Sequence, residues 1–167
     1  MKDEVLFFES QRFRQAWLWL LVISSNATLF YFIFQELSNE TGHALARKTA
    51  VTLLIPVFIC LATTVLLFLI RLETMIKADG IYVRFFPVHR TYRKYGWDKL
   101  SNVYVRQYSP LWEYGGWGYR LTIGGGKAYN VSGNKGIQLV ANDNSKLLIG
   151  TKREGEVSEI LKNYFKK

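Results

Sequence analysis

Two long stretches without a charged side chain occupy most of the first 70 residues of this chain. They are residues 16–34, AWLWLLVISSNATLFYFIF, and residues 49–70, TAVTLLIPVFICLATTVLLFLI. A helix rises about 1.5 Å per residue, so each stretch would cover close to the roughly 30 Å of bilayer hydrocarbon. The pattern predicts a transmembrane hairpin over residues 16–71, preceded by an N-terminal segment, residues 1–15, that lies along the inner headgroup layer.

Basic residues concentrate near the ends of the hairpin that both chain termini share. The connecting segment, roughly residues 35–48, holds only Arg47 and Lys48. The shared ends carry Arg12, Arg14, Arg71, Lys77, Arg84 and Arg90. Because cytoplasmic flanks are enriched in Lys and Arg, this distribution predicts that both termini lie in the cytoplasm. A signal peptide cleaved after Ala27 is a weaker alternative, since three acidic residues precede the apolar stretch and apolar LFYFIF follows that position.

Polar side chains lie near the middle of both predicted spans. An antiparallel hairpin brings them to a similar depth, and an unpaired polar group in hydrocarbon is costly. We therefore expect these side chains to bond across the two helices or to a partner span. A transport path is the alternative, but it would need ionisable groups or more helices. The expected helix-contact residues are Ser24, Ser25, Asn26, Thr28, Thr63 and Thr64.

The hydrophobic periodicity changes from helical to alternating after Leu72. Short alternating runs, separated by turn residues such as ADG at 78–80, predict six or seven strands. At the end of the chain, a capping box from Thr151 to Glu154 precedes an amphipathic repeat that is typical of a helix. A small antiparallel β-barrel or sandwich, capped by this helix, would fill residues 72–167 as a cytoplasmic domain, which makes the whole chain an α+β membrane protein.

The scarcity of reactive side chains and the net charge narrow the function classes. The chain has one cysteine, Cys60, and two histidines, His43 and His89, and no Ser/His/Asp or Cys/His set is visible. We therefore expect no enzyme activity, no metal and no cofactor. Residues 72–167 carry 16 basic and 8 acidic side chains, a difference of +8, which suits an anionic partner such as a lipid surface.

Residues 113–136, EYGGWGYRLTIGGGKAYNVSGNKG, contain eight glycines in 24 positions. A phosphate loop of the Walker type is excluded, because Leu121 stands where the first glycine belongs and Ala128 where a Ser or Thr belongs. Turns and bulges of a curved sheet are the simpler interpretation. The alternative is a docking surface for a membrane or a protein, in which Glu113 would pair with Arg120. Its candidate residues are Glu113, Tyr114, Trp117, Tyr119, Arg120, Tyr129, Asn130 and Asn134.

A basic run is a second candidate surface. Arg90, Arg93 and Lys94 fall in a predicted strand, HRTYRKYGW, close to where the membrane would lie. A solvated strand is the simpler interpretation, and contact with anionic headgroups is the alternative. Interleaved bases and aromatics also occur in single-strand nucleic-acid binders, but two membrane spans disfavour a nucleic acid as the partner.

Several motifs resemble known bacterial proteins. DGIYVRFFP, GWDKLSNVYV and the ending GIQL…LLIGT…EVSEILKN look like bacterial members of the pleckstrin-homology-like group, whose layout is a set of strands followed by one C-terminal capping helix. FRQAWLWL, EYGGWGYR and GKAYNVSGNKG together resemble an uncharacterised family of two-pass bacterial membrane proteins. The resemblance implies this fold and a bacterial inner-membrane location, and it brings no established activity.

These features predict a membrane-anchored, non-catalytic binding or assembly module that serves as an accessory subunit or regulator of a membrane complex. Its partner would be another protein or a second copy of the chain. The alternative is a module that binds anionic phospholipid at the inner leaflet. That alternative predicts binding to vesicles that weakens steeply as the salt concentration rises.

Overall fold

A computed structural model of the chain resolves two compact units. The residues that the structure describes are 4–39, 46–122 and 126–165. One unit is helical and covers Arg14–Leu69, and the other is a β unit that combines Met1–Phe13 with Ile70–Lys167. Part of the predicted connecting segment, residues 40–45, and part of the predicted glycine turn, residues 123–125, lie outside the described residues.

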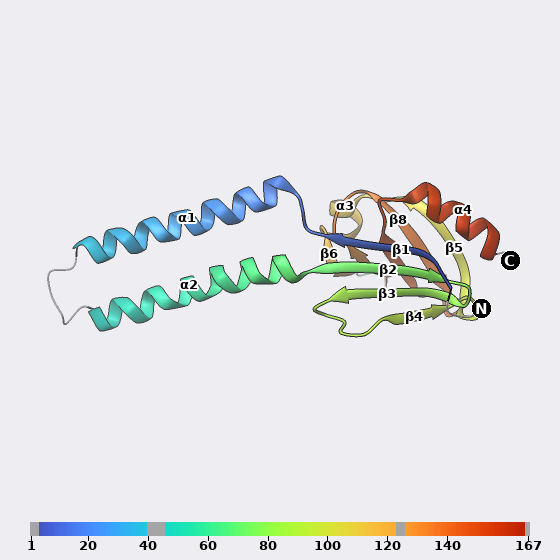
Figure 1. The fold of residues 1–167 in the computed structure, drawn as a ribbon, viewed down its shortest axis with the longest axis horizontal. Helices are drawn as coiled ribbons and strands as arrows, with labels where there is room; N and C mark the ends of the chain where they lie inside the picture. The colour runs from blue at the N-terminus through green and yellow to red at the C-terminus, as the bar shows by residue number, and fades with distance from the viewer. Residues whose placement is uncertain (1–3, 40–45, 123–125, 166–167) are drawn as a thin grey trace. The chain divides into compact units, whose positions relative to one another are not determined.

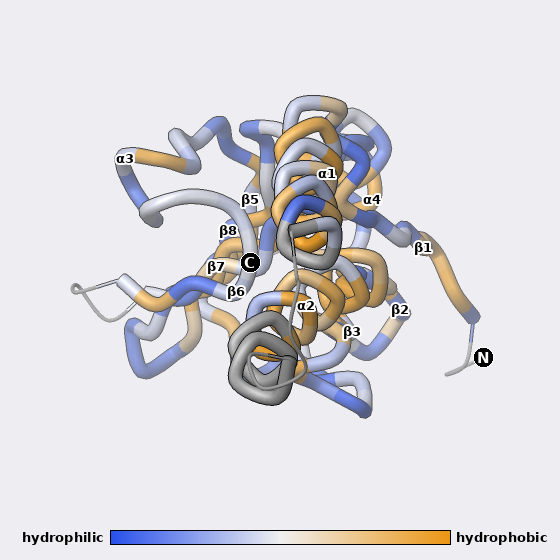
Figure 2. The backbone as a smooth tube through the Cα atoms, turned by 90° about the vertical axis from the view of Figure 1, so that its left-hand side faces the viewer, coloured by the Kyte–Doolittle hydropathy of each residue, from blue (hydrophilic) through white to orange (hydrophobic). Residues whose placement is uncertain are grey.

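The helical unit consists of α1 (Ala16–Asn39) and α2 (Ala46–Leu69) (Figure 1). Among the described residues, one stretch, Ala16–Gln35, is long and apolar enough to cross a membrane by length and composition. The second predicted span is not supported, because the described apolar part of α2, Leu54–Leu69, is shorter than a bilayer crossing requires. Figure 2 shows the hydrophobic character of the described parts of both helices.

One of the predicted polar contacts joins the two helices. Asn26 Nδ2 donates to Thr64 Oγ1 at 3.4 Å and to the Val22 carbonyl of its own helix at 2.7 Å. This confirms the expected pairing for these two polar residues. The other predicted contact residues either donate to a carbonyl of their own helix, as Ser24 and Thr63 do, or are exposed, as are Ser25 and Thr28.

The β unit contains two sheets (Figure 1). The first has the order β1-β2-β3-β4, with β1 (Val5–Arg12), β2 (Arg71–Lys77), β3 (Gly80–Phe86) and β4 (Arg93–Gly96). The second has the order β5-β8-β9-β7-β6, with β5 (Leu100–Gln107), β6 (Gly118–Leu121), β7 (Gly126–Asn130), β8 (Lys135–Ala141) and β9 (Lys146–Gly150). The described strands do not close into a barrel, and β7 runs parallel to β9. The predicted mixed α+β class is therefore confirmed, whereas a closed or wholly antiparallel barrel is wrong.

The main core combines side chains of both sheets with those of the C-terminal helix. Helix α4 (Glu154–Tyr164), which the periodicity predicted, packs against β5 and β8 and contributes Val157 and Leu161. The strands supply alternate residues to this core, including Leu72, Ile76, Ile81, Val83, Ile137, Leu139 and Ile149. Two short helices complete the unit, η1 (Trp97–Lys99) and α3 (Pro110–Tyr114).

Strand β1 is part of the first sheet, contrary to the expectation that residues 1–15 lie along the membrane surface. It pairs antiparallel with β2, from Val5 opposite Lys77 to Arg12 opposite Arg71. Phe7 faces the core and is buried. The N-terminal segment therefore completes the β unit before the chain enters α1.

The inward-facing polar side chains of β1 bind the last residue of β9 and the residue that follows it. Glu9 accepts a hydrogen bond from the Thr151 hydroxyl at 2.6 Å, and Gln11 Nε2 donates to the Gly150 carbonyl at 2.9 Å. Thr151 does not cap α4, because the N-cap is Arg153, which has no side-chain cap bond; the Thr151 hydroxyl donates to Glu9 and its oxygen accepts from the Arg153 N–H at 3.1 Å. The predicted capping box is therefore wrong, although the predicted helix is present.

Candidate docking surfaces

Helix α3 is short, and its limits follow from its sequence. Pro110 occupies the first turn, where a missing backbone N–H costs little. Gly115 ends the helix in the left-handed conformation, at φ 67°, and its N–H bonds to the Leu111 carbonyl at 2.9 Å. At this position the glycine-rich region serves as turn structure, which agrees with the simpler interpretation of the sequence.

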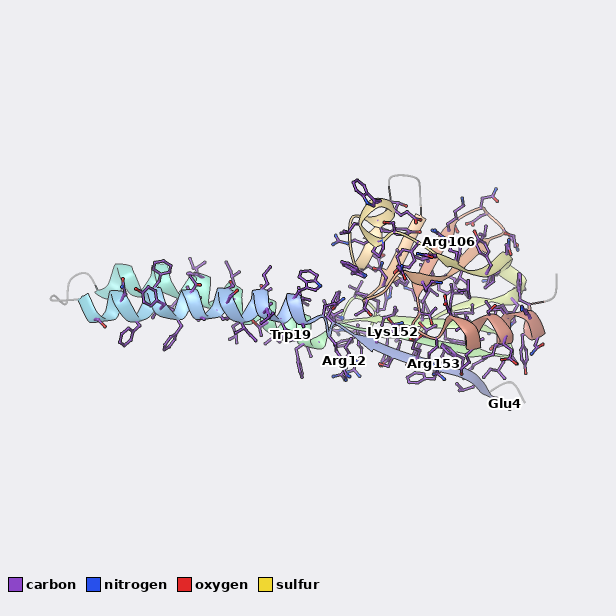
Figure 3. The ribbon with its side chains drawn as sticks, turned by 90° about the horizontal axis from the view of Figure 1, so that it is seen from above. Glu4, Arg12, Trp19, Arg106, Lys152 and Arg153 are labelled. Carbon is purple, nitrogen blue, oxygen red and sulfur yellow. The ribbon has the colours of Figure 1, made fainter. Side chains whose placement is uncertain are left out.

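An open pocket of about 470 Å³ lies on the outer face of the second sheet, beside α3. Arg106 of β5, which is labelled in Figure 3, bonds to three other residues that line the pocket. The guanidinium donates to Gln138 Oε1 at 3.0 Å and to Glu113 Oε2 at 2.7 Å. A third bond reaches Tyr114 Oη at 3.1 Å. The pocket is lined by Tyr104, Arg106, Glu113, Tyr114, Thr122, Gly126, Gln138 and Lys146.

Two of the three charged groups in this pocket compensate each other. The hydrogen bond with Arg106 lowers the pKa of Glu113, and the same bond raises the pKa of Arg106. Lys146 is exposed, and within the described part of the chain its ammonium group has no hydrogen-bond or ion-pair partner. The pocket therefore offers one free cation beside the phenol groups of Tyr104 and Tyr114, an arrangement that suits a carboxylate or carbonyl oxygen of a ligand.

Some residues of the predicted docking surface line the pocket, and others are buried inside the β unit. Glu113 and Tyr114 line the pocket, whereas Tyr129 and Asn130 are completely buried. Tyr129 stacks on Tyr119 with 5.1 Å between ring centroids, and the Asn130 amide bonds to β6 and to the residue that follows β5. Tyr129 and Asn130 therefore stabilise the fold, which corrects their assignment to a docking surface.

The predicted ion pair between Glu113 and Arg120 is not formed. Glu113 pairs with Arg106, and Arg120 Nε donates to the Trp117 carbonyl at 3.1 Å. The Trp117 indole in turn donates to a carbonyl in the turn after β7 at 3.1 Å. Arg120 and Asn134 are exposed, so of the remaining predicted residues these two are the most accessible.

The three predicted lipid-contact residues differ in their charge partners, although Arg93 and Lys94 are neighbours in β4. Lys94 pairs with Asp79 beside the turn between β2 and β3, and the bond to Lys94 is the leading cause of the lowered pKa of Asp79. Because its charge is compensated there, Lys94 is removed from the candidate lipid contacts. Arg90 and Arg93 are exposed, and neither has a carboxylate partner within the described residues. Arg90 precedes β4, so the predicted strand starts later than the pattern indicated.

His89 belongs to the connection from β3 to β4. Its ring packs in an aromatic cluster against the edge of the second sheet. Its ring centroid is 5.6 Å from that of Tyr119 and 5.3 Å from that of Tyr129. The side chain is 6 % exposed, and neither ring nitrogen has a partner within the described residues. Burial, followed by the charges of Arg93 and Lys127, lowers the pKa of His89, so the imidazole is neutral at pH 7.

Two exposed apolar residues on α3 were missed in the sequence. Trp112 is 93 % exposed and Leu111 is 61 % exposed. Their signal was the short run PLWEY, in which large apolar side chains stand between a proline and a glycine turn. An exposed indole on a short helix is typical of a contact surface, because burial of its apolar ring against a partner would be favourable.

No protein-family model, curated protein or solved structure matches this chain. Among the described residues, no group of three or more His, Cys, Asp or Glu side chains is placed to hold a metal ion. The surfaces of the molecule and the connectivity of its two units are therefore what bear on its function.

Proposed function

We propose that this protein is a membrane-anchored, non-catalytic binding module that holds or regulates a protein partner at the inner face of a bacterial cytoplasmic membrane. The anchor is α1, whose apolar stretch Ala16–Gln35 has the length of a bilayer crossing. The docking site is the pocket around Arg106 and Lys146. The arginines that flank the helical unit, Arg12 and Arg71 among them, favour a cytoplasmic β unit and cytoplasmic termini.

The connectivity of the first sheet supports two crossings. Strand β1 precedes α1 and β2 follows α2, yet the two strands are paired neighbours. A chain that crosses a bilayer through α1 therefore has to return through α2 to complete the sheet. Helix α2 has 24 residues in all and so a length of about 36 Å, but its described apolar part, Leu54–Leu69, is shorter than a crossing, so a second crossing would also need the uncharged residues from Thr49 that precede it. If the chain does not cross the bilayer twice, it does not cross it at all.

A pleckstrin-homology-like fold of the β unit is part of the same proposal. It is supported by the two sheets of four and five strands and by α4, which packs on one of them. In the second sheet, β5, β8 and β9 form an antiparallel series, and the hairpin of β6 and β7 is added beyond β9. This layout agrees with what the sequence resemblance implies.

One observation supports the docking proposal most directly. Polar side chains in the pocket are held in place by bonds to one another, and the nearby Lys146 has no partner within the described residues. Gln138 is buried, and its amide donates to the Leu147 carbonyl at 3.3 Å while its oxygen accepts from Arg106. Because Arg106 and Glu113 are already held in place, a partner would not have to order them, which lowers the cost of binding. Lys146 then supplies the charge that a partner's carboxylate would compensate.

Site-specific photo-crosslinking in the native membrane tests this function. A photoreactive amino acid is placed at Tyr104, inside the pocket, and at Glu159, which is exposed on α4. We expect a crosslinked product of protein size from position 104 and none from position 159, and we expect Lys146→Glu to weaken it several-fold. No product from position 104, or equal products from both positions, would contradict the docking proposal.

Contact with anionic phospholipid is a second candidate function. The observation that favours it is that Arg90, in the connection after β3, and Arg93, at the start of β4, are exposed and have no carboxylate partner within the described residues. Lipid contact and protein docking would use different residues, so one does not exclude the other.

A further inference from the structure

The β unit has one end at which the chain passes to and from the helices, called here the helix-linked end. Three residues separate Arg12, the end of β1, from Ala16, the start of α1 (Figure 3), and one residue separates the end of α2 from Arg71, the start of β2. The strand register places Arg12 beside Arg71, and Arg71 beside Phe86. Consecutive Cα atoms are about 3.8 Å apart, so the chain alone keeps Arg71 within roughly 8 Å of the last residue of α2.

Contacts inside the β unit bring α3 to the same end. Gln11, the neighbour of Arg12, donates to the Gly150 carbonyl at 2.9 Å. Gly150 lies so close to Asn130 that a Cβ there would meet the Asn130 side chain at 3.1 Å. The Asn130 amide donates to the Tyr108 hydroxyl at 3.1 Å, and the Tyr108 ring lies 5.9 Å from Tyr114 of α3. Figure 1 likewise shows α3 and β6 at the end of the β unit where β1 finishes.

Large apolar side chains are exposed at this end. Besides Trp112 and Leu111 on α3, Val88 in the connection after β3 is 55 % exposed. Phe86 pairs with Arg71, so the connection that holds Val88 extends from the helix-linked end of the first sheet. Tryptophan is enriched where membrane meets water, because its ring is apolar and its N–H still finds a partner there.

Several arginines on the elements near this end lack a carboxylate partner within the described residues. The arginines at or beside this end that have no carboxylate partner within the described residues are Arg12, Arg90, Arg93 and Arg120. The carboxylates of neighbouring elements are already engaged, Glu73 by Arg84, Glu113 by Arg106 and Glu154 by Lys135. At the opposite end of the first sheet, by contrast, Lys94 is paired with Asp79. Uncompensated positive charge is therefore present where the chain approaches the proposed anchor, although it is not confined to this end, since Lys99 and Lys146 are also exposed and have no carboxylate partner within the described residues.

We propose that the helix-linked end rests on an anionic bilayer surface, with Val88, Leu111 and Trp112 in the headgroup region and the unpaired arginines bound to lipid phosphates. This inference rests on the proposed anchoring, because the helices bring this end to the bilayer. Guanidinium groups bind phosphate through paired hydrogen bonds, and a cytoplasmic leaflet rich in anionic lipid attracts basic segments. An amphipathic surface of this composition suits the boundary between headgroups and acyl chains.

Spin-label depth measurements on the full chain in lipid nanodiscs test this inference. In a Cys60→Ala background, one label is attached at Leu111→Cys on α3 and another at Glu159→Cys on α4, where both native side chains are exposed. The discs contain phosphatidylcholine alone or phosphatidylcholine with phosphatidylglycerol. In the anionic discs, we expect the ratio of oxygen to aqueous nickel accessibility to be several-fold higher at position 111 than at position 159.

Two sets of variants identify the groups responsible. Trp112→Ser is expected to move the label at position 111 towards water. Arg90→Gln combined with Arg120→Gln is expected to make its depth insensitive to phosphatidylglycerol. Lys94→Gln combined with Lys135→Gln removes the same charge from two cations that are already paired, and it should leave the depth unchanged.

The outcomes separate this inference from the anchoring on which it rests. If the protein resists alkaline extraction from its native membranes but position 111 is as accessible to nickel as position 159, the inference is overturned and the anchor stands. Protein that is released by alkaline extraction contradicts the anchor instead. A label at position 111 that is shielded only in the presence of a copurified protein identifies a protein contact at this end, which also overturns the inference.

Discussion

Replacement of His89 by phenylalanine tests the packing between the two sheets. The imidazole is 6 % exposed, its nitrogens have no partner within the described residues, and its ring contacts Tyr119 and Tyr129. A buried polar group without a partner costs about 1–3 kcal/mol. Phenylalanine keeps the ring contacts, and its slightly larger volume costs about 1 kcal/mol in a packed core. We therefore expect His89→Phe to raise the free energy of unfolding by about 1 kcal/mol at neutral pH, or Tm by roughly 2–4 °C.

The same substitution should remove one source of pH dependence. Burial, together with Arg93 and Lys127, lowers the pKa of His89 below its usual 6.5. Between that lowered pKa and 6.5, the unfolded chain binds a proton that the folded chain does not, so the free energy of unfolding decreases as the pH falls below about 6.5. Above this range both states are neutral and His89 contributes no slope. The slope is at most about 1.4 kcal/mol per pH unit, and His89→Phe should lack it.

The assay is denaturant or thermal unfolding of the detergent-solubilised full chain, followed by near-ultraviolet circular dichroism, from about pH 5 to about pH 8. His89→Gln keeps a polar group at this position and is the control that should show no gain in stability. If the free energy of unfolding of His89→Phe fell by more than about 1 kcal/mol at neutral pH, the description of His89 as a buried imidazole without a hydrogen-bond partner would be refuted. An equal loss of stability on acidification in the variant and the unsubstituted protein would refute it as well.

Three further substitutions test other contacts by the same unfolding assay. Glu9→Ala should cost about 2–3 kcal/mol, because it removes a charged acceptor from the buried Thr151 hydroxyl, and a change below about 0.5 kcal/mol would contradict the role of β1. Gly115→Ala should cost about 1 kcal/mol from the left-handed conformation alone, since an added Cβ meets nothing within 4 Å; a neutral result would show that α3 ends differently. Asn26→Leu should cost about 0.6 kcal/mol through loss of the bond to Thr64, and a gain in stability would indicate that this bond does not hold the helices.

The elements that could be predicted from the sequence are those whose patterns are local. Alternation predicted a series of short strands after Leu72, and β2, β3, β5, β8 and β9 lie in that part of the chain; in β5, for example, Val103 is buried and its neighbour Tyr104 is exposed. The repeat of three and four residues predicted α4. In each case the burial of a side chain depends on neighbours a few residues away, which a sequence pattern contains.

Strand β1 could not be predicted because its inward side is polar. Glu9 and Gln11 occupy positions where a strand normally carries apolar residues, and their partners Thr151 and Gly150 are 142 and 139 residues away in the sequence. A polar residue looks solvent-exposed until its distant partner is known. The parallel pairing of β7 with β9 has the same origin, since strand order within a sheet is a long-range property.

The pocket could be predicted only in part for the same reason. Glu113 and Tyr114 were recognised within one motif, but Arg106, Gln138 and Lys146 come from β5, β8 and β9 and meet only when these strands are neighbours. The exposed Trp112 is different, because PLWEY was a local signal that could have been recognised in the sequence.

Cysteine labelling in intact cells tests the central claim, a two-crossing anchor with the β unit on the cytoplasmic side, most directly. In a Cys60→Ala background, one cysteine replaces Ser38 near the end of α1 and another replaces Glu159 on α4, where both native residues are exposed. We predict that a membrane-impermeant maleimide labels position 38 in intact cells and position 159 only after the cells are permeabilised. Labelling of both positions to the same extent in intact cells, or labelling of position 159 alone, would contradict this topology.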